Sequence, residues 1–257
     1  MITAGVDVGL KNIKVVILDD GKIVAKGIGK SEGVIRPQSI EAVWSEALAE
    51  AGLKESDIVK TVATGQGKYD VDFADKNVTD VVAIARGARW FFPEAAFVMD
   101  AGADQTRIAV LGEGNEVKSF VTNQKCMAGL GLLLDIAADR LGMTIDGISA
   151  LPQGASAGTV VNDGCPVFAE QGMLELLNDG AEKEKIAGAI VDMVAIRLQS
   201  ILNDKEHPGK HDTVLFGGVA KNKAVVCGLE SLSGIEFLIP EEAEYGAAAG
   251  AAVIAAD

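Results

Sequence analysis

Two of the three cysteines in this 257-residue chain stand directly in front of predicted helices. Cys126 precedes two glycines and an apolar helical pattern that runs to Leu141, and Cys165 precedes Pro166, a residue favoured at the first position of a helix. The unpaired N–H groups and the positive dipole end of a helix start favour a thiolate or another anion. Both positions therefore suit a thiolate. Position alone, however, favours the interpretation that each cysteine is a buried free thiol acting as a small apolar residue.

A second pattern with chemical meaning is an Asp-x-Gly turn that occurs twice, at Asp7 with Gly9 and at Asp100 with Gly102. The residues around the two copies also correspond: Lys14 with Arg107, Leu18 with Leu111 and Gly21 with Gly114. Such a turn at the end of a strand exposes N–H groups to a phosphate, and its carboxylate can hold a magnesium ion or its water shell. A single copy is a common turn, so the duplication is what predicts two turns that clamp a triphosphate from both sides.

A third glycine segment runs from Asp212 to Asn222, where a short apolar strand leads into Gly217 and Gly218 and a helix is expected to start near Lys221. A strand, a diglycine and a helix start allow a flat base or a ribose to lie against the backbone. The alternative is an ordinary tight turn between a strand and a helix. The two Asp-x-Gly turns favour the nucleotide interpretation.

The elements that must position these turns follow from periodicity. Residues 4–9, 11–18 and 22–28 are predicted to be strands, with an Asp-Asp-Gly hairpin between the second and the third, and 58–65 is a buried strand ending in a glycine turn. Residues 40–53 and 78–91 are predicted helices, and 240–256 is a small-residue helix suited to close packing. The repeat predicts two related α/β subdomains around a cleft, 1–95 and 96–257, with the C-terminal helix able to pack back on the first.

Composition excludes several classes of partner. A formal charge of -14 and a pI near 4.6 argue against nucleic acid and anionic membranes. No apolar run reaches the roughly 18 residues of a membrane span, and the first residues lack the basic region of an export signal. Three scattered cysteines are too few for a disulfide scaffold, so we expect a reducing, cytoplasmic location.

The three glycine segments resemble the phosphate-1, phosphate-2 and adenosine motifs of the acetate and sugar kinase, Hsp70 and actin superfamily, in that order. Within it, the segments KCMAGLGLLLDIAADRLG and CPVFAEQGMLELL, together with ATGQGKYDV and ARGA, resemble the BadF/BadG/BcrA/BcrD ATPase family across essentially the whole chain. That family comprises activators of 2-hydroxyacyl-CoA dehydratases and ATPase subunits of benzoyl-CoA reductase. The resemblance implies an actin-like α/β ATPase fold built from two duplicated ribonuclease-H-like subdomains.

The resemblance also implies a dimer with one 4Fe-4S cluster at its interface, held by Cys126 and Cys165 of each protomer, while Cys227 matches no ligand position and is expected to pack. The second protomer is a copy or a paralogous ATPase subunit. ATP drives an electron from the cluster to an acyl-CoA dehydratase or a benzoyl-CoA reductase, with ferredoxin or flavodoxin as the donor, in the cytoplasm of an anaerobe.

For the nucleotide, the resemblance implies that Asp7 and Asp100 serve Mg²⁺ and the attacking water of ATP hydrolysis to ADP, with Gln105 beside them as a catalytic residue. The residues implied to contact the nucleotide are Gly9, Lys11, Asn12, Lys14, Gly102, Ala103, Asp104, Gly217, Gly218, Val219 and Lys221. The chain departs from the family where small hydroxyl residues usually follow the first turn, so that phosphate donors must come from Lys11, Asn12 or the backbone. It also exchanges the amide and acid of the usual GGQD, and Ile84 stands where a histidine is common.

These departures leave two alternatives open. One is a non-catalytic or weakly catalytic ATPase-fold subunit of a heteromeric reductase, which the altered motifs favour and the intact Asp-x-Gly pair opposes. The other is a small-molecule kinase of the same superfamily, for whose substrate domain 257 residues leave little room.

Overall fold

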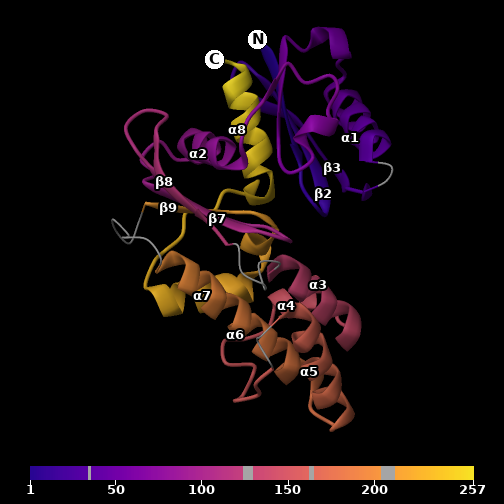
Figure 1. The fold of residues 1–257 in the computed structure, drawn as a ribbon, viewed down its shortest axis with the longest axis vertical. Coiled ribbons are helices and arrows are strands. Elements are labelled where there is room, and N and C mark those ends of the chain that lie inside the picture. Colours follow the sequence, from indigo (N-terminus) through magenta and orange to yellow (C-terminus); the bar gives the residue numbers. More distant parts are fainter. Residues whose placement is uncertain (34–35, 124–129, 162–164, 204–211) are drawn as a thin grey trace. The chain divides into compact units, whose positions relative to one another are not determined.

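A computed structural model describes residues 1–33, 36–123, 130–161, 165–203 and 212–257 (Figure 1). The chain divides into two compact units. The first comprises residues 1–98, 109–119 and 240–257, and the second comprises 99–108 and 120–239. The subdomain boundary at residues 95 and 96 stays a prediction.

The first unit is built on a five-stranded sheet of order β3-β2-β1-β4-β5. Its strands are β1 (Ile2–Val8), β2 (Asn12–Asp19), β3 (Lys22–Lys30), β4 (Lys60–Thr64) and β5 (Lys76–Asn77). β1 runs antiparallel to β2 and parallel to β4. Asp20 and Gly21 join β2 to β3 with φ angles of 45° and 75°, which confirms the predicted hairpin turn. The helices are α1 (Arg36–Ala51), α2 (Asp80–Phe91) and α8 (Gly246–Ala255).

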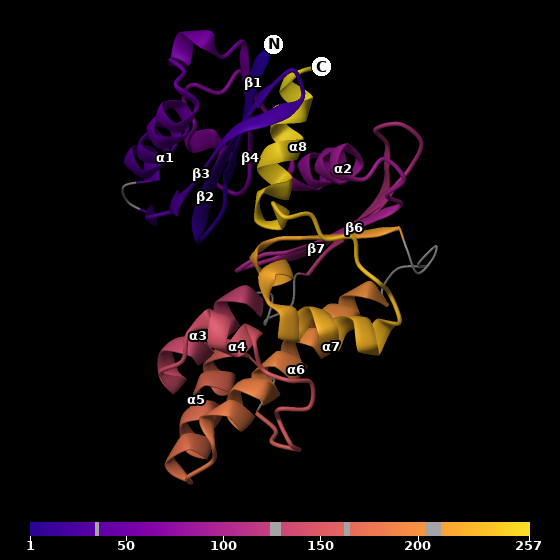
Figure 2. The ribbon, with the colours of Figure 1, turned by 180° about the vertical axis from the view of Figure 1, so that it is seen from behind.

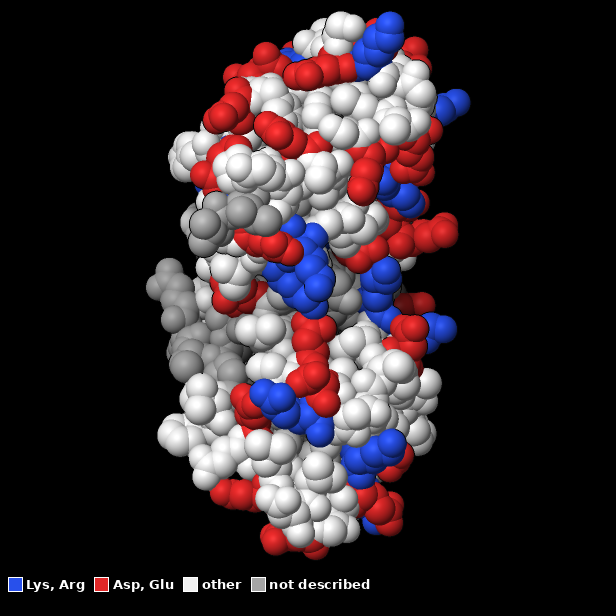
Figure 3. All heavy atoms as spheres, turned by 90° about the vertical axis from the view of Figure 1, so that its right-hand side faces the viewer, with Lys and Arg blue, Asp and Glu red and all other residues white. Residues whose placement is uncertain are grey.

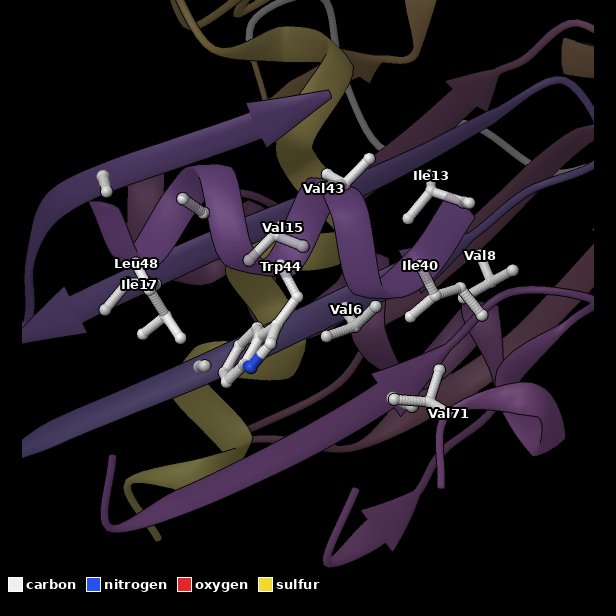
Figure 4. Packing of buried hydrophobic residues seen from close by; sticks show 14 residues of the cluster. Val6, Val8, Ile13, Val15, Ile17, Ile40, Val43, Trp44, Leu48 and Val71 are labelled. Carbon is white, nitrogen blue, oxygen red and sulfur yellow. The ribbon is translucent and has the colours of Figure 1, made fainter. Parts of the chain in front are cut away.

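Alternation along β2 gives this sheet two buried faces. Ile13, Val15 and Ile17 point toward α1, where Trp44 lies among them (Figure 4). The intervening Val16 packs against α8 instead. α8 also packs on α2, and the small residues predicted for close packing make this approach possible, because a side chain on Gly250 would meet the α2 backbone.

A four-stranded sheet of order β8-β7-β6-β9 repeats the β3-β2-β1-β4 arrangement of the first. Its strands are β6 (Phe97–Ala101), β7 (Thr106–Leu111), β8 (Val117–Thr122) and β9 (Thr213–Phe216). The matching order extends the duplication of the two turns to whole sheets.

The helices of the second unit gather around α6, whose core-facing side is buried (Figure 2). They are α3 (Leu130–Leu141), α4 (Ile145–Ser149), α5 (Pro166–Asn178), α6 (Lys183–Leu202) and α7 (Lys223–Ser233). Short 3-10 turns occupy Glu55–Asp57, Lys68–Asp70, Gly218–Lys221 and Ala243–Tyr245.

The surface reflects the acidic composition. Acidic side chains are spread over the face drawn in Figure 3, with lysines and arginines between them. Among the described helices, none combines the length and apolarity that crossing a bilayer requires.

Candidate functional site

The first Asp-x-Gly turn follows β1 directly. Asp7 lies opposite Lys14 in the β1–β2 ladder, so the two side chains emerge on the same face and form an ion pair, Nζ to Oδ2 at 3.2 Å. Both side chains are largely buried. The N–H of Gly9 donates to the carbonyl oxygen of Asn12 at 3.0 Å, which closes the turn. Lys11 is exposed and Asn12 is half-buried.

A glycine loop after β4 holds this turn from the side. Gly65 has a φ of +89°, and a Cβ built on it would meet the carbonyl group of Val8 and lie 2.7 Å from Oδ1 of Asp7. The N–H of Gly67 donates to the Val8 carbonyl oxygen at 3.0 Å. Asp80, at the start of α2, accepts from the Gly65 N–H at 2.7 Å. The loop therefore connects the position of Asp7 to α2.

The second turn repeats the geometry of the first. The N–H of Gly102 donates to the carbonyl oxygen of Gln105 at 3.0 Å, as Gly9 does to Asn12. Arg107 takes the place of Lys14, and its Nη1 lies 3.5 Å from Oδ2 of Asp100. Its Nη2 also donates to Oε1 of Gln105 at 2.5 Å. Ala103 and Asp104 form the half-buried part of the turn.

The diglycine segment closes on this second turn. Gly217 follows β9 with a φ of +93°, and a Cβ on it would meet the backbone of Ala101, 2.5 Å from its carbonyl carbon. Gly65 and Gly217 are thus equivalent. Each follows the fourth strand of its repeat, and each packs against the backbone of the residue that comes directly after the aspartate of the turn.

The predicted adenosine segment differs in one detail from expectation. Gly218–Lys221 is a 3-10 turn rather than the start of an α-helix, and α7 begins at Lys223 with Asn222 as its N-cap, accepting from the Val225 N–H at 3.1 Å. Gly218 and Lys221 are exposed and Val219 is buried. An asparagine at the cap satisfies N–H groups that a lysine cannot, which is why the helix starts later.

Helix α3 starts on the second turn. The Gly131 N–H donates to the Gly102 carbonyl oxygen at 3.2 Å, and the Leu132 N–H donates to that of Ala103 at 3.0 Å. A Cβ on Gly131 would lie 2.8 Å from the Gly102 oxygen, so only glycine allows this approach. The turn and α3 are therefore mechanically connected.

The cysteines have three different outcomes. Cys165 is the N-cap of α5, as predicted, with a partly exposed thiol that makes no side-chain cap hydrogen bond. Cys126 lies outside the described residues. The expectation that Cys227 packs in the interior is wrong: it is exposed, because Val225 and Leu229 occupy the buried side of α7 and residue 227 falls on the other. Neither described cysteine is in a disulfide.

Sequence reasoning missed three residues that support these turns: Gly65, Asp80 and Arg107. Arg107 appeared only as the counterpart of Lys14. A signal for Gly65 was present, since TVATG at 61–65 matches TVLFG at 213–217. Ile84 is fully buried in α2, and a histidine there would need a partner within the core.

Comparison with known proteins places these features in context. The profile of the BadF/BadG/BcrA/BcrD ATPase family matches residues 4–255. The (R)-2-hydroxyglutaryl-CoA dehydratase activating ATPase of Acidaminococcus fermentans is 34% identical over 98% of this chain and 96% of its own length. The activator of lactoyl-CoA dehydratase of Anaerotignum propionicum is 31% identical over 99% of this chain and 97% of its own.

A solved structure extends the similarity to the fold. The activator of the 2-hydroxyisocaproyl-CoA dehydratase from Clostridium difficile, with bound ADPNP, superimposes with a TM-score of 0.89 at 30% identity, covering 99% of this chain and 94% of that one. The predicted actin-like ATPase fold is confirmed.

Proposed function

We propose that this chain, which belongs to the BadF/BadG/BcrA/BcrD ATPase family, uses Mg-ATP to drive single electrons from a 4Fe-4S cluster to a 2-hydroxyacyl-CoA dehydratase or a related acyl-CoA reductase. The relatives that activate such dehydratases, each aligned over nearly the whole chain, support this assignment. So does the preserved duplication of the two Asp-x-Gly turns.

The observation that carries the proposal is the pair of hydrogen bonds between α3 and the second turn. A γ-phosphate bound at the turn, beside Gly102 and at the N–H group of Ala103, shifts that turn, and Gly131 and Leu132 at the start of α3 follow it because their N–H groups donate to the turn. Cys126 precedes α3 by only a few residues in sequence. Nucleotide state and the cysteine segment are thus linked through a short stretch of backbone.

In this scheme the ion-paired aspartates, Asp7 and Asp100, would hold Mg²⁺, which when bound supplies charge stabilisation for the phosphates, and one of the two aspartates would orient the attacking water. Lys14 pairs with Asp7 and Arg107 pairs with Asp100, and each contact holds the direction of its carboxylate. The turns at Gly9 and Gly102, which have no side chain to keep a phosphate away, contact the phosphates together with Lys11 and Asn12. Gly217, Gly218, Val219 and Lys221 contact the nucleoside.

Of the two cysteines predicted to bind the cluster, Cys165 lies within the described residues, and its surroundings suit a cluster ligand. The Cys165 thiol is free of a disulfide and of a cap hydrogen bond, and it stands at the N-terminus of the 13-residue α5, where the positive end of the helix dipole suits an anionic cluster. Val167 and Phe168 beside it are 69% and 55% exposed. Apolar residues exposed next to a ligand support a second protomer covering this end of α5. When bound, the cluster supplies a one-electron couple tuned by its surroundings.

The experiment is an anaerobic activation assay. The protein is purified without oxygen, reduced, and mixed with a 2-hydroxyacyl-CoA dehydratase in the presence of Mg-ATP, of a non-hydrolysable analogue, or of no nucleotide. We expect dehydratase activity only with Mg-ATP. Equal dehydratase activity without nucleotide would overturn the proposal. ATP turnover with no activation of any 2-hydroxyacyl-CoA dehydratase or benzoyl-CoA reductase would leave the small-molecule kinase alternative.

A further inference from the structure

We infer that Arg107 is a positioning residue for ATP hydrolysis, one that holds the side chains of Asp100 and Gln105 in a single fixed arrangement. This inference rests on the proposed function and names a residue that the phosphate motifs alone do not. It follows from the contacts of the Arg107 guanidinium, which stands on β7 beside the second turn and reaches both of these side chains.

The geometry suits a planar fork. Nη1 of Arg107 lies 3.5 Å from Oδ2 of Asp100, and Nη2 donates to Oε1 of Gln105 at 2.5 Å. The guanidinium keeps its nitrogen atoms in one plane, so fixing one partner fixes the direction of the other. The Arg107 and Asp100 side chains are only 13% and 16% exposed, so water screens this pair little.

The contact also decides which end of the Gln105 amide is presented. Arginine has donors and no acceptor, so the amide turns its oxygen toward Arg107 and its NH₂ group away. The backbone carbonyl of Gln105 is held as well, because it accepts from Gly102. Gln105 therefore offers a donor, suited to a phosphate oxygen, rather than an acceptor, and the acceptor for a proton of the attacking water is the Asp100 carboxylate.

The first turn shows what the fork adds. There Lys14 reaches Asp7 with a single ammonium group, and Asn12 stands where Gln105 stands in the repeat. A lysine gives a point charge and no planar pair of donors. The two copies have thus diverged: the second carries the bridged carboxylate and amide, and we assign the orienting of the attacking water to it.

The test compares Arg107→Lys, Arg107→Gln, Gln105→Ala and the double variant Gln105→Ala/Arg107→Lys with the wild type. Arg140→Lys and Arg140→Gln serve as matched controls, since Arg140 lies in the same unit, pairs with Glu170 at 2.6 Å and stands in the last turn of α3, at the opposite end from the second Asp-x-Gly turn. The readouts are kcat and KM for Mg-ATP, binding of ADP with and without Mg²⁺, and thermal stability.

We expect Arg107→Lys to lower kcat about 10-fold and Arg107→Gln about 100-fold, the range seen when an oriented group at a reaction centre is lost. KM and ADP binding should change less than about threefold, and thermal stability of Arg107→Lys should match that of its Arg140 control. Gln105→Ala should make the Arg107→Lys substitution nearly silent, because the bridge has then lost its partner.

The inference is wrong if Arg107→Lys keeps wild-type kcat, if the loss appears in KM alone, or if the effects of Gln105→Ala and Arg107→Lys simply multiply. A wild type that binds ADP but does not turn over ATP overturns it together with the ATP-driven function. A wild type with full turnover and an unaffected Arg107→Lys variant removes this inference alone.

Discussion

Gly65→Ala is the substitution through which the support of Asp7 can be tested most sharply. The new Cβ would lie 2.6 Å from the carbonyl carbon of Val8 and 2.7 Å from Oδ1 of Asp7. Ordinary contact begins at 3.4 Å, so the loop and the end of β1 must separate by more than 0.8 Å, the difference between 3.4 and 2.6 Å, because the Val8 carbonyl oxygen lies nearer still than its carbon. The φ of +89° is a backbone conformation that glycine adopts without strain, so the alanine adds conformational strain as well.

Two terms set the magnitude. The left-handed conformation costs about 1–2 kcal/mol for a non-glycine residue, and overpacking of a close contact costs about 1–3 kcal/mol. The sum of about 2–5 kcal/mol corresponds to a fall in Tm of roughly 4–20 °C for a chain of this size. A displacement near 1 Å at Asp7 should lower ATP turnover about 100-fold when the assay is run well below the Tm.

Gly52→Ala is the matched control. Gly52 also has a positive φ, +67°, but a Cβ there meets nothing within 4 Å. It should therefore show only the conformational cost of about 1–2 kcal/mol and leave turnover unchanged. The assay pairs thermal unfolding with steady-state ATP hydrolysis for both variants. Equal Tm and equal turnover in Gly65→Ala and Gly52→Ala would refute the idea that the loop holds Asp7.

Other perturbations test the remaining links. Gly131→Ala should keep nucleotide affinity but lower dehydratase activation per ATP about tenfold, because its methyl group pushes α3 off the second turn; titrations with nucleotide beside activation assays decide this, and unchanged activation would contradict it. Asp257→Asn removes the contacts of that carboxylate with Arg86 at 2.6 and 3.0 Å. The hydrogen bond to Arg86 lowers the pKa of Asp257 below its ordinary 3.8, so the stability is present above about pH 4 and is lost as pH falls through the lowered pKa. For this half-exposed pair we expect the Tm of Asp257→Asn to be about 2 °C below that of the wild type at pH 7 and equal to it near pH 2, as measured by calorimetry. Gly250→Ala should lower Tm by more than about 4 °C, because its Cβ would lie 2.8 Å from the carbonyl carbon of Ala83; a Tm within 1 °C of wild type would show that α2 and α8 can separate at little cost.

The parts of the fold that local chemistry controls could be predicted from sequence. The hairpin at Asp20 and Gly21, the end of α1 before Gly52 and the start of α5 after Cys165 each depend on turn or cap preferences of a few neighbouring residues. The duplication was visible for the same reason, since both turns carry the same short pattern.

What sequence did not reveal depends on contacts between distant residues. Asp80 reaches Gly65 across a 15-residue separation, and nothing in the local pattern of α2 sets that aspartate apart from an ordinary first-turn acid. The Arg107–Gln105 contact is local, but it needs a known turn conformation before the side chains can be placed. Cys227 was misplaced because it was expected to pack on the ground that it matches no ligand position, without the helical period that turns it outward.

The most direct test of the central claim is the iron and sulfide content of anaerobically isolated protein, measured for the wild type, Cys126→Ala, Cys165→Ala and Cys227→Ala. The account predicts about two iron atoms per chain in a dimer, as one shared four-iron cluster requires. It predicts loss of the iron in the first two variants and full retention in the third. Iron content that survives Cys165→Ala, or that falls equally in Cys227→Ala, would contradict the claim that this chain shares a cluster with a second protomer.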